Sequence, residues 1–208
     1  MVRHGYSVSN FNKTFTGQLE APLTGIGVKQ AQKVCQYIFE NYIIDAIYSS
    51  DLSRAVNTIK PLSVLTGLPI KTDADLREVY GGDWQGKKFE DLERLFPEDY
   101  ARWKAYDKDM RPTNGESMFE LEQRAVMVVS KIAKENPEKT VVIATHGGII
   151  KALRGNLMGL TVERFGEIPY ANNASVMEVG YDGQKLEILA HPVDSYLGDL
   201  ITHMPKGA

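Results

Sequence analysis

The chain of 208 residues contains one cysteine, Cys35, and lacks any long apolar run. A single cysteine excludes an internal disulfide, and its place in a helical pattern predicts a buried structural thiol. No stretch is long enough to span a bilayer, and no signal-peptide pattern is present. We therefore predict a cytoplasmic protein without a membrane partner.

The sequence also lacks a strong charge of either sign. Lys and Arg number 24 and Asp and Glu 27, which gives a formal net charge of −3. This balance argues against a nucleic-acid partner, which favours a basic face. The net charge does not exclude a small anionic substrate, because the charges inside a pocket determine which ligand it binds. The length fits a single domain over residues 1–208.

Histidine is scarce as well, since the chain has four. His4 and His146 each follow a short apolar run and precede a glycine, which predicts two positions just beyond strands. Ligands of open α/β sheets bind at that edge. We therefore predict His4 as a nucleophile and His146 as its phosphate-binding neighbour. Only Met1 and Val2 precede Arg3, so the first strand is shorter than the usual length of about five residues.

Alternating apolar runs and helical patterns predict an α/β three-layer sandwich, with a mostly parallel central sheet and helices on both faces. The expected strands are 43–49, 70–75 and 141–144, with an antiparallel hairpin over 175–189 around Asp182-Gly183. The expected helices start at Thr24, at Ser50 or Asp51 as N-cap candidates, at the Ser117–Glu120 capping box, and after His146, the last running through Leu153.

Residues 87–116 interrupt this alternation. Residues 89–96 have a short amphipathic helical pattern that Pro97 is expected to stop, and a polar stretch follows. We predict a small helical cap insertion over the pocket, within the single domain. A solvated loop is the alternative interpretation.

Further polar residues follow the predicted strands. Residues 5–23 are rich in Ser, Asn, Thr and Gly, which fits either a surface loop or an anion-binding loop. Arg54 lies in the first turn of its helix, where a cation is locally unfavourable unless it binds an anion or forms a surface salt bridge. Glu78 stands at the mouth of a glycine-rich loop.

This set of residues suits phosphoryl transfer. Arg3 and Arg54 can match the spread charge of a phosphoryl group bidentately, and a neutral imidazole can attack phosphorus. A carboxylic acid at Glu78 can protonate the departing oxygen. Because arginines and histidines supply positive charge and no metal-binding spacing is present, we predict no metal.

At this point the chain resembles a known family over nearly its whole length. Arg3-His4-Gly5 is similar to the RHG signature of the histidine phosphatase superfamily, also called the phosphoglycerate mutase-like family. Further resemblances are a phosphate loop at Ser7 and Asn10, a turn at Thr16-Gly17-Gln18, "PLT..G..QA" from Pro22, "SSDLxRA" from Ser49, "LxE…GxWEG" from Leu76, "GES" from Gly115 and "SHGG" at Thr145-His146-Gly147-Gly148.

The resemblance implies roles for these residues. His4 becomes the phosphorylated nucleophile and Glu78 the proton donor, while Arg3, Arg54 and His146 form the phosphate pocket. The candidate substrate- or phosphate-binding residues are Ser7, Asn10, Thr16, Gly17 and Gly147. Tyr6 departs from the pattern, because many members carry glutamate there.

Three functions remain possible at this stage. The first is a metal-independent phosphomonoesterase that works through a phosphohistidine on a small phosphorylated metabolite, without a cofactor. The second is a cofactor-dependent phosphoglycerate mutase, which would need 2,3-bisphosphoglycerate and a basic cluster that residues 87–116 dilute with acids. The third is a non-catalytic regulator that binds a phosphorylated ligand. The residues favour the phosphomonoesterase, as a monomer or a homodimer, and leave the substrate open.

Overall fold

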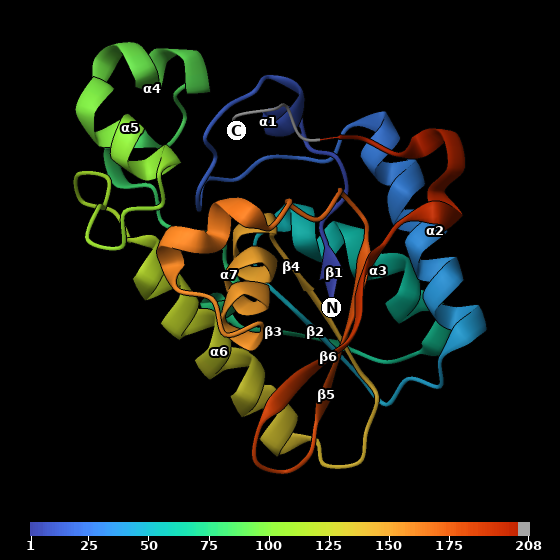
Figure 1. The fold of residues 1–208 in the computed structure, drawn as a ribbon. Coiled ribbons are helices and arrows are strands. Elements are labelled where there is room, and N and C mark those ends of the chain that lie inside the picture. The colour runs from blue at the N-terminus through green and yellow to red at the C-terminus, as the bar shows by residue number, and fades with distance from the viewer. Residues whose placement is uncertain (204–208) are drawn as a thin grey trace.

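A six-stranded sheet forms the centre of the computed structural model, which describes residues 1–203. The strand order is β3-β2-β4-β1-β5-β6 (Figure 1). The strands are β1 (Val2–Arg3), β2 (Ala46–Ser49), β3 (Ile70–Thr72), β4 (Val141–Thr145), β5 (Val176–Tyr181) and β6 (Leu186–Val193). The first four pair in parallel, and β5 and β6 are antiparallel. The predicted α/β class, the mostly parallel sheet and the C-terminal hairpin are therefore confirmed.

Helices cover both faces of this sheet. One face carries α2 (Gly25–Asn41) and α3 (Ser53–Thr66), and the other carries α6 (Met118–Glu135) and α7 (Gly147–Leu157) (Figure 1). Each pair packs on its own apolar core, because successive side chains of a strand point to opposite faces. Cys35 is fully buried in the α2 core, and burial raises the pKa of its thiol to about 12, as a structural cysteine requires.

Shorter helices complete the chain. They are α1 (Val8–Phe11), α4 (Phe89–Leu95) and α5 (Pro97–Lys104), with 3-10 turns at Ala74–Leu76, Gly82–Trp84, Val162–Glu167 and Ser195–Leu200. The capping box of α6 is present as predicted, since Ser117 accepts the Glu120 N–H and Glu120 accepts the Ser117 N–H. Among residues 1–203, no helix combines the length and the hydropathy that crossing a bilayer requires.

The structure corrects several boundary predictions. The strand predicted at 70–75 ends at Thr72. The strand predicted at 43–49 begins at Ala46, because Ile43 precedes the sheet and is 89% exposed. The N-cap of α3 is Leu52, whereas Ser50 and Asp51 direct their side chains to His146 and Arg77. The helix after His146 continues four residues past the predicted end at Leu153 and finishes at Leu157.

A further correction concerns the segment after Pro97. The helix predicted over 89–96 ends before this proline, as expected, because α4 finishes at Leu95, but the polar stretch predicted to follow begins with a second helix, α5. Proline suits the first helical position, where no N–H is needed and its fixed φ is already helical. The segment predicted as a helix and a polar stretch therefore contains two helices, α4 and α5.

An aromatic cluster ties these two helices to the rest of the molecule. The fully buried Trp84 ring meets Phe15, Tyr100 and Trp103 edge-on at centroid distances of 5.8 to 5.9 Å. Trp103 and Tyr100 belong to α5, while Phe15 lies in the loop after α1. Edge-to-face pairs of this kind add to the burial of apolar area. The two short helices are thus held against the loop near His4.

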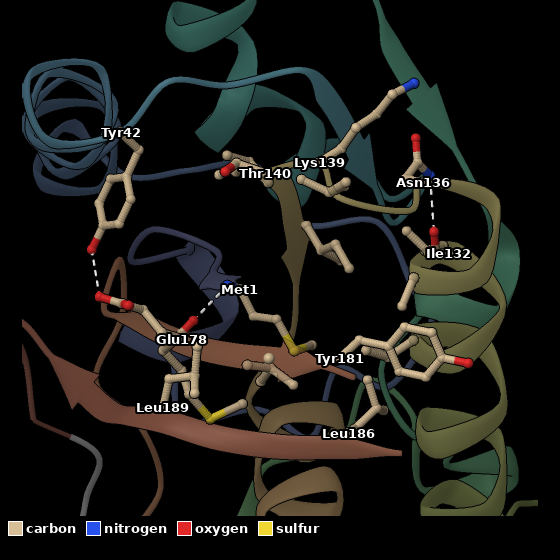
Figure 2. A pocket seen from close by; sticks show the side chains of 18 of the residues that line it. Met1, Tyr42, Ile132, Asn136, Lys139, Thr140, Glu178, Tyr181, Leu186 and Leu189 are labelled. Carbon is tan, nitrogen blue, oxygen red and sulfur yellow. Dashed lines mark hydrogen bonds between the residues drawn. The ribbon is translucent and has the colours of Figure 1, made fainter. Parts of the chain in front are cut away.

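The first strand is as short as predicted. In the described part of the chain, β1 covers only Ala144 and Thr145 of β4, so Val141 to Ile143 face a groove of about 820 Å³. Figure 2 shows this groove, with Met1 and Glu178 at one side and Leu186 at another. It lies at the amino ends of the parallel strands, opposite the edge that carries His4.

Candidate active site

The predicted catalytic residues meet at the carboxyl edge of the parallel strands. Arg3 ends β1, His4 follows it, and His146 follows β4. The His4 N–H donates to the Thr145 carbonyl at 2.9 Å, and the His4 carbonyl accepts from Asn173 Nδ2 at 3.0 Å. These bonds fix the backbone on both sides of His4 although β1 has only two residues.

A single hydrogen bond sets the tautomer of His4. Its Nδ1 lies 2.8 Å from the Gly5 carbonyl oxygen, which can only accept. Nδ1 therefore carries the proton, and in the neutral ring Nε2 keeps its lone pair. His4 is 4% exposed and lines a cavity of about 90 Å³, so its ring is largely shielded from solvent at the wall of this cavity.

Ser50 sets the opposite tautomer in His146. The Ser50 Oγ accepts the Leu52 N–H at 3.3 Å and lies 2.8 Å from His146 Nε2. The described residues provide no other acceptor for the Ser50 hydroxyl proton, so Ser50 donates to Nε2 and the His146 proton resides on Nδ1. The buried Nδ1 has no hydrogen-bond partner in the described part of the chain. It is a donor that an oxygen of an anionic ligand can satisfy.

Both imidazoles are neutral at neutral pH. Burial lowers the pKa of His4 well below 6.5, and the charges of Arg54 and Arg3 lower it further. Burial also lowers the pKa of His146, as do Arg54 and the neighbouring His4. The two rings lie 5.2 Å apart between centroids. The site therefore holds its positive charge on the arginines, while the histidines offer one lone pair and one N–H.

The two arginines are buried and anchored by backbone carbonyls. Arg54, 1% exposed, donates to the carbonyls of Gly17 and Leu19, both at 2.8 Å. Arg3 donates to the Ala171 carbonyl. Burial lowers the pKa of Arg54 to about 10, so that guanidinium remains charged at neutral pH. Two fixed cations beside His4 form a site for spread negative charge.

Glu78 lies on the same cavity and is held by backbone N–H groups. Its Oε1 accepts the Val79 N–H at 2.9 Å and its Oε2 accepts the Gly148 N–H at 3.0 Å. A Cβ on Gly148 would lie 2.1 Å from Glu78 Oε1, so any side chain at this position would displace the Glu78 carboxylate. Arg124 holds the backbone of the segment that carries Glu78. It donates to the carbonyls of Asp75, Arg77 and Glu78, and it forms an ion pair with Glu116 at 2.7 Å.

The polar loop after His4 includes one helical turn. Ser7 caps α1, and its side chain bonds Ser9 Oγ and Asn10 Oδ1. Asn10 Oδ1 also accepts from Asn173 Nδ2 at 3.2 Å. With its oxygen so engaged, Asn10 presents its amide N–H groups to the cavity that it lines.

The structure brings most of the predicted site residues to this one cavity. Its lining includes Arg3, His4, Asn10, Thr16, Gly17, Arg54, Glu78 and Gly147. Ser7 and His146 do not line it: Ser7 is buried beneath α1, and His146 stands beside His4. Ser9 and Thr14, which also line the cavity, belong to the segment 5–23 that was interpreted as a surface loop or an anion-binding loop. Sequence reasoning missed Tyr170 and the aromatic residues Phe15, Phe89 and Trp103, which line the same cavity.

The arrangement suits transfer of a group with spread negative charge. It combines a nitrogen lone pair, two cations and a carboxyl group across one small cavity, with the His146 ring 5.2 Å from the ring of His4. Among residues 1–203, no cluster of three or more His, Cys, Asp or Glu side chains is placed to hold a metal ion. The positive charge that the chain itself supplies comes from arginine.

Comparison with known proteins places this geometry in a family. The model of the histidine phosphatase superfamily (branch 1) matches residues 1–193. The chain is 30% identical over 186 residues to a glucosyl-3-phosphoglycerate phosphatase of Mycolicibacterium vanbaalenii, covering 86% of this chain and 82% of that one. It is 26% identical to a metal-independent phosphoserine phosphatase of Arabidopsis thaliana, covering 88% and 87%.

The fold of this chain matches that of a solved structure over almost the full length of both. YhfR of Bacillus stearothermophilus superposes with a TM-score of 0.89 at 28% identity, covering 94% of this chain and 96% of that one. The matching fold and the arginine, histidine and glutamate arrangement at the sheet edge lead to one conclusion. The chain belongs to branch 1 of the histidine phosphatase superfamily.

Proposed function

We propose that the protein is a metal-independent phosphomonoesterase that acts through a phosphohistidine on a small phosphorylated metabolite. The observation that carries this proposal is the His4 tautomer. The Gly5 carbonyl holds the proton on Nδ1, which leaves the Nε2 lone pair in a cavity that Arg3 and Arg54 also line. That the relatives above are named phosphatases supports the same reaction.

The reaction takes place in two steps. In the first, His4 Nε2 attacks phosphorus, the bond from phosphorus to the alcohol oxygen breaks, and Glu78 gives that oxygen its proton. In the second, water attacks phosphohistidine, Glu78 takes the proton from the water, and inorganic phosphate leaves with His4 restored. Arg3, Arg54 and the His146 Nδ1–H stabilise the non-bridging oxygens in both steps.

A phosphoglycerate mutase is the second candidate from the sequence. It uses the same phosphohistidine but returns the phosphoryl group to a second hydroxyl of a substrate that carries a carboxylate. Such a substrate needs a further cation in the cavity. In the described residues the cationic side chains that line it are Arg3 and Arg54, both beside His4. This lining favours transfer to water.

We expect phosphate release from simple phosphomonoesters, unchanged by a metal chelator, and no conversion of 3-phosphoglycerate to 2-phosphoglycerate when 2,3-bisphosphoglycerate is present. Phosphate release and isomerisation are measured on the same preparation. Isomerisation with little phosphate release would identify a mutase. If both activities are absent and the protein still binds a phosphorylated ligand, the result would support a non-catalytic regulator.

The lowered pKa of His4 predicts how activity depends on pH. A lowered pKa means that the nucleophilic neutral form persists below pH 6.5, where an ordinary histidine is half protonated. We expect the acid limb of kcat/KM that belongs to His4 to lie well below pH 6.5. The substrate phosphate also titrates near pH 6, so two substrates that differ in phosphate acidity are compared. A limb common to both and centred at or above pH 6.5 would contradict the prediction.

A further inference from the structure

The cavity has two unlike parts. The residues beside His4 are polar or charged, whereas the remaining wall is apolar and aromatic. That wall consists of Phe15, Val79, Phe89, Trp103, Met118 and Tyr170. The phosphoryl group belongs with the first part, because the arginines and His4 are there. The wall is therefore what contacts the alcohol part of the substrate.

The aromatic side chains of this wall are fixed by their neighbours. The Phe15 ring meets Phe89 and Trp103 edge-on, each at 5.9 Å between centroids. Tyr170 has the Lys151 ammonium 4.2 Å from the centre of its ring. Flat, immobilised rings lose little conformational entropy when they contact a ligand, and they favour apolar or aromatic groups.

No further cation is available to this wall in the described part of the chain. Lys87 of the cap donates to the Asp83 carbonyl and lies over the Phe96 ring, and the other basic side chains of the cap form ion pairs with acidic neighbours at its surface. The pairs are Lys88–Glu90, Arg94–Asp91, Lys104–Glu93, Arg102–Asp107, Lys108–Asp109 and Arg111–Glu120, at 2.8 to 3.6 Å. Lys151 does not line the cavity, since its ammonium is buried over the rings of Tyr106 and Tyr170.

We propose that the alcohol part of the substrate is uncharged and apolar, an aryl or short alkyl group, and that the site discriminates against monoesters that carry a carboxylate there. This inference rests on the proposed phosphatase function. A carboxylate buried against the wall without a cationic partner is unfavourable, because it loses its hydration. Contact with an aromatic or alkyl group is favourable, because it removes apolar surface from water.

The test compares phenyl phosphate with 4-carboxyphenyl phosphate, which share a ring and differ by one carboxylate. The carboxylated phenol is no worse a leaving group, so slower turnover of its ester reports on binding. We expect kcat/KM to be at least about tenfold higher for phenyl phosphate, a difference that corresponds to about 1.4 kcal/mol. Equal or faster turnover of the carboxylated ester would overturn the proposal.

A second test introduces a positive charge into the wall and measures how the preference between the two esters changes. Phe89→Lys places a cation on the wall, and we expect the ratio of the two kcat/KM values to fall about tenfold or to invert. Leu95→Lys is the matched control on the same helix, because Leu95 is exposed and does not line the cavity. A ratio that stays unchanged in a folded Phe89→Lys protein would also overturn the proposal.

The two hypotheses fail in different ways. If neither ester releases phosphate, the proposed phosphatase function is wrong. If both release phosphate but the carboxylated ester is preferred, the phosphatase function stands and only the apolar substrate class is wrong.

Discussion

His4→Ala is expected to reduce turnover of a phosphomonoester on the order of 10⁴-fold or more, the scale seen when a covalent nucleophile is removed. Alanine has no nitrogen to accept the phosphoryl group, and Glu78, His146 and the arginines cannot replace it. The side chain's own bond to the Gly5 carbonyl is lost, but the bonds of the His4 backbone to Thr145 and Asn173 remain. We therefore expect a folded, inactive protein.

Three measurements check this result. Steady-state phosphate release gives the activity, intact-protein mass after a brief acid-free quench shows whether a phosphoryl group is trapped, and circular dichroism reports the fold. His191→Ala is the control, because His191 is exposed on β6. Near-wild-type turnover in His4→Ala would contradict the mechanism. A phosphoryl mass shift that survives in that variant would place the covalent intermediate on another residue.

Glu78→Gln is expected to slow a substrate according to its leaving group. An alkyl phosphate needs its departing oxygen protonated, so we expect a loss of about 10² to 10⁴-fold, the usual contribution of general acid catalysis. An activated aryl phosphate such as 4-nitrophenyl phosphate leaves without a proton, and we expect a much smaller loss.

The ratio between the two substrates is the decisive readout for Glu78. Glutamine has one acceptor oxygen where the carboxylate has two, so the Val79 or the Gly148 N–H loses its partner. Any local rearrangement that follows affects both substrates alike and cancels in the ratio. An equal loss on both substrates would count against Glu78 as the acid and would assign it a positioning role.

The sequence predicted the parts of the site that local pattern determines. Short apolar runs before His4 and His146 indicated strand ends, and parallel strands bring their ends to one edge. The Ser117–Glu120 capping box correctly placed the start of α6, because both of its hydrogen bonds are local. The family motifs agreed with these positions, and they named the family that the comparisons confirmed.

Other features depend on contacts that no local pattern records. Ser50 resembles an N-cap residue in sequence, yet its hydroxyl bonds His146, 96 positions away. The wall around Trp103 and Tyr170 combines residues from the cap and from the segment before β5. Pro97 follows the end of one helix as predicted, but it also begins the next helix, α5, which packs on Trp84 through contacts that the local sequence does not record.

The groove between β4 and β5 leaves residues 141–143 of β4 without a partner strand on one side, although β4 lies inside the sheet. A strand that lacks a neighbour offers its N–H and C=O groups to any extended chain, which is how sheets begin to aggregate. Residues with ionisable side chains, Glu178 and Lys139 among them, line this groove (Figure 2). Charge on an open edge opposes pairing with a second molecule. The candidate active site and this groove thus lie at opposite ends of the same parallel strands.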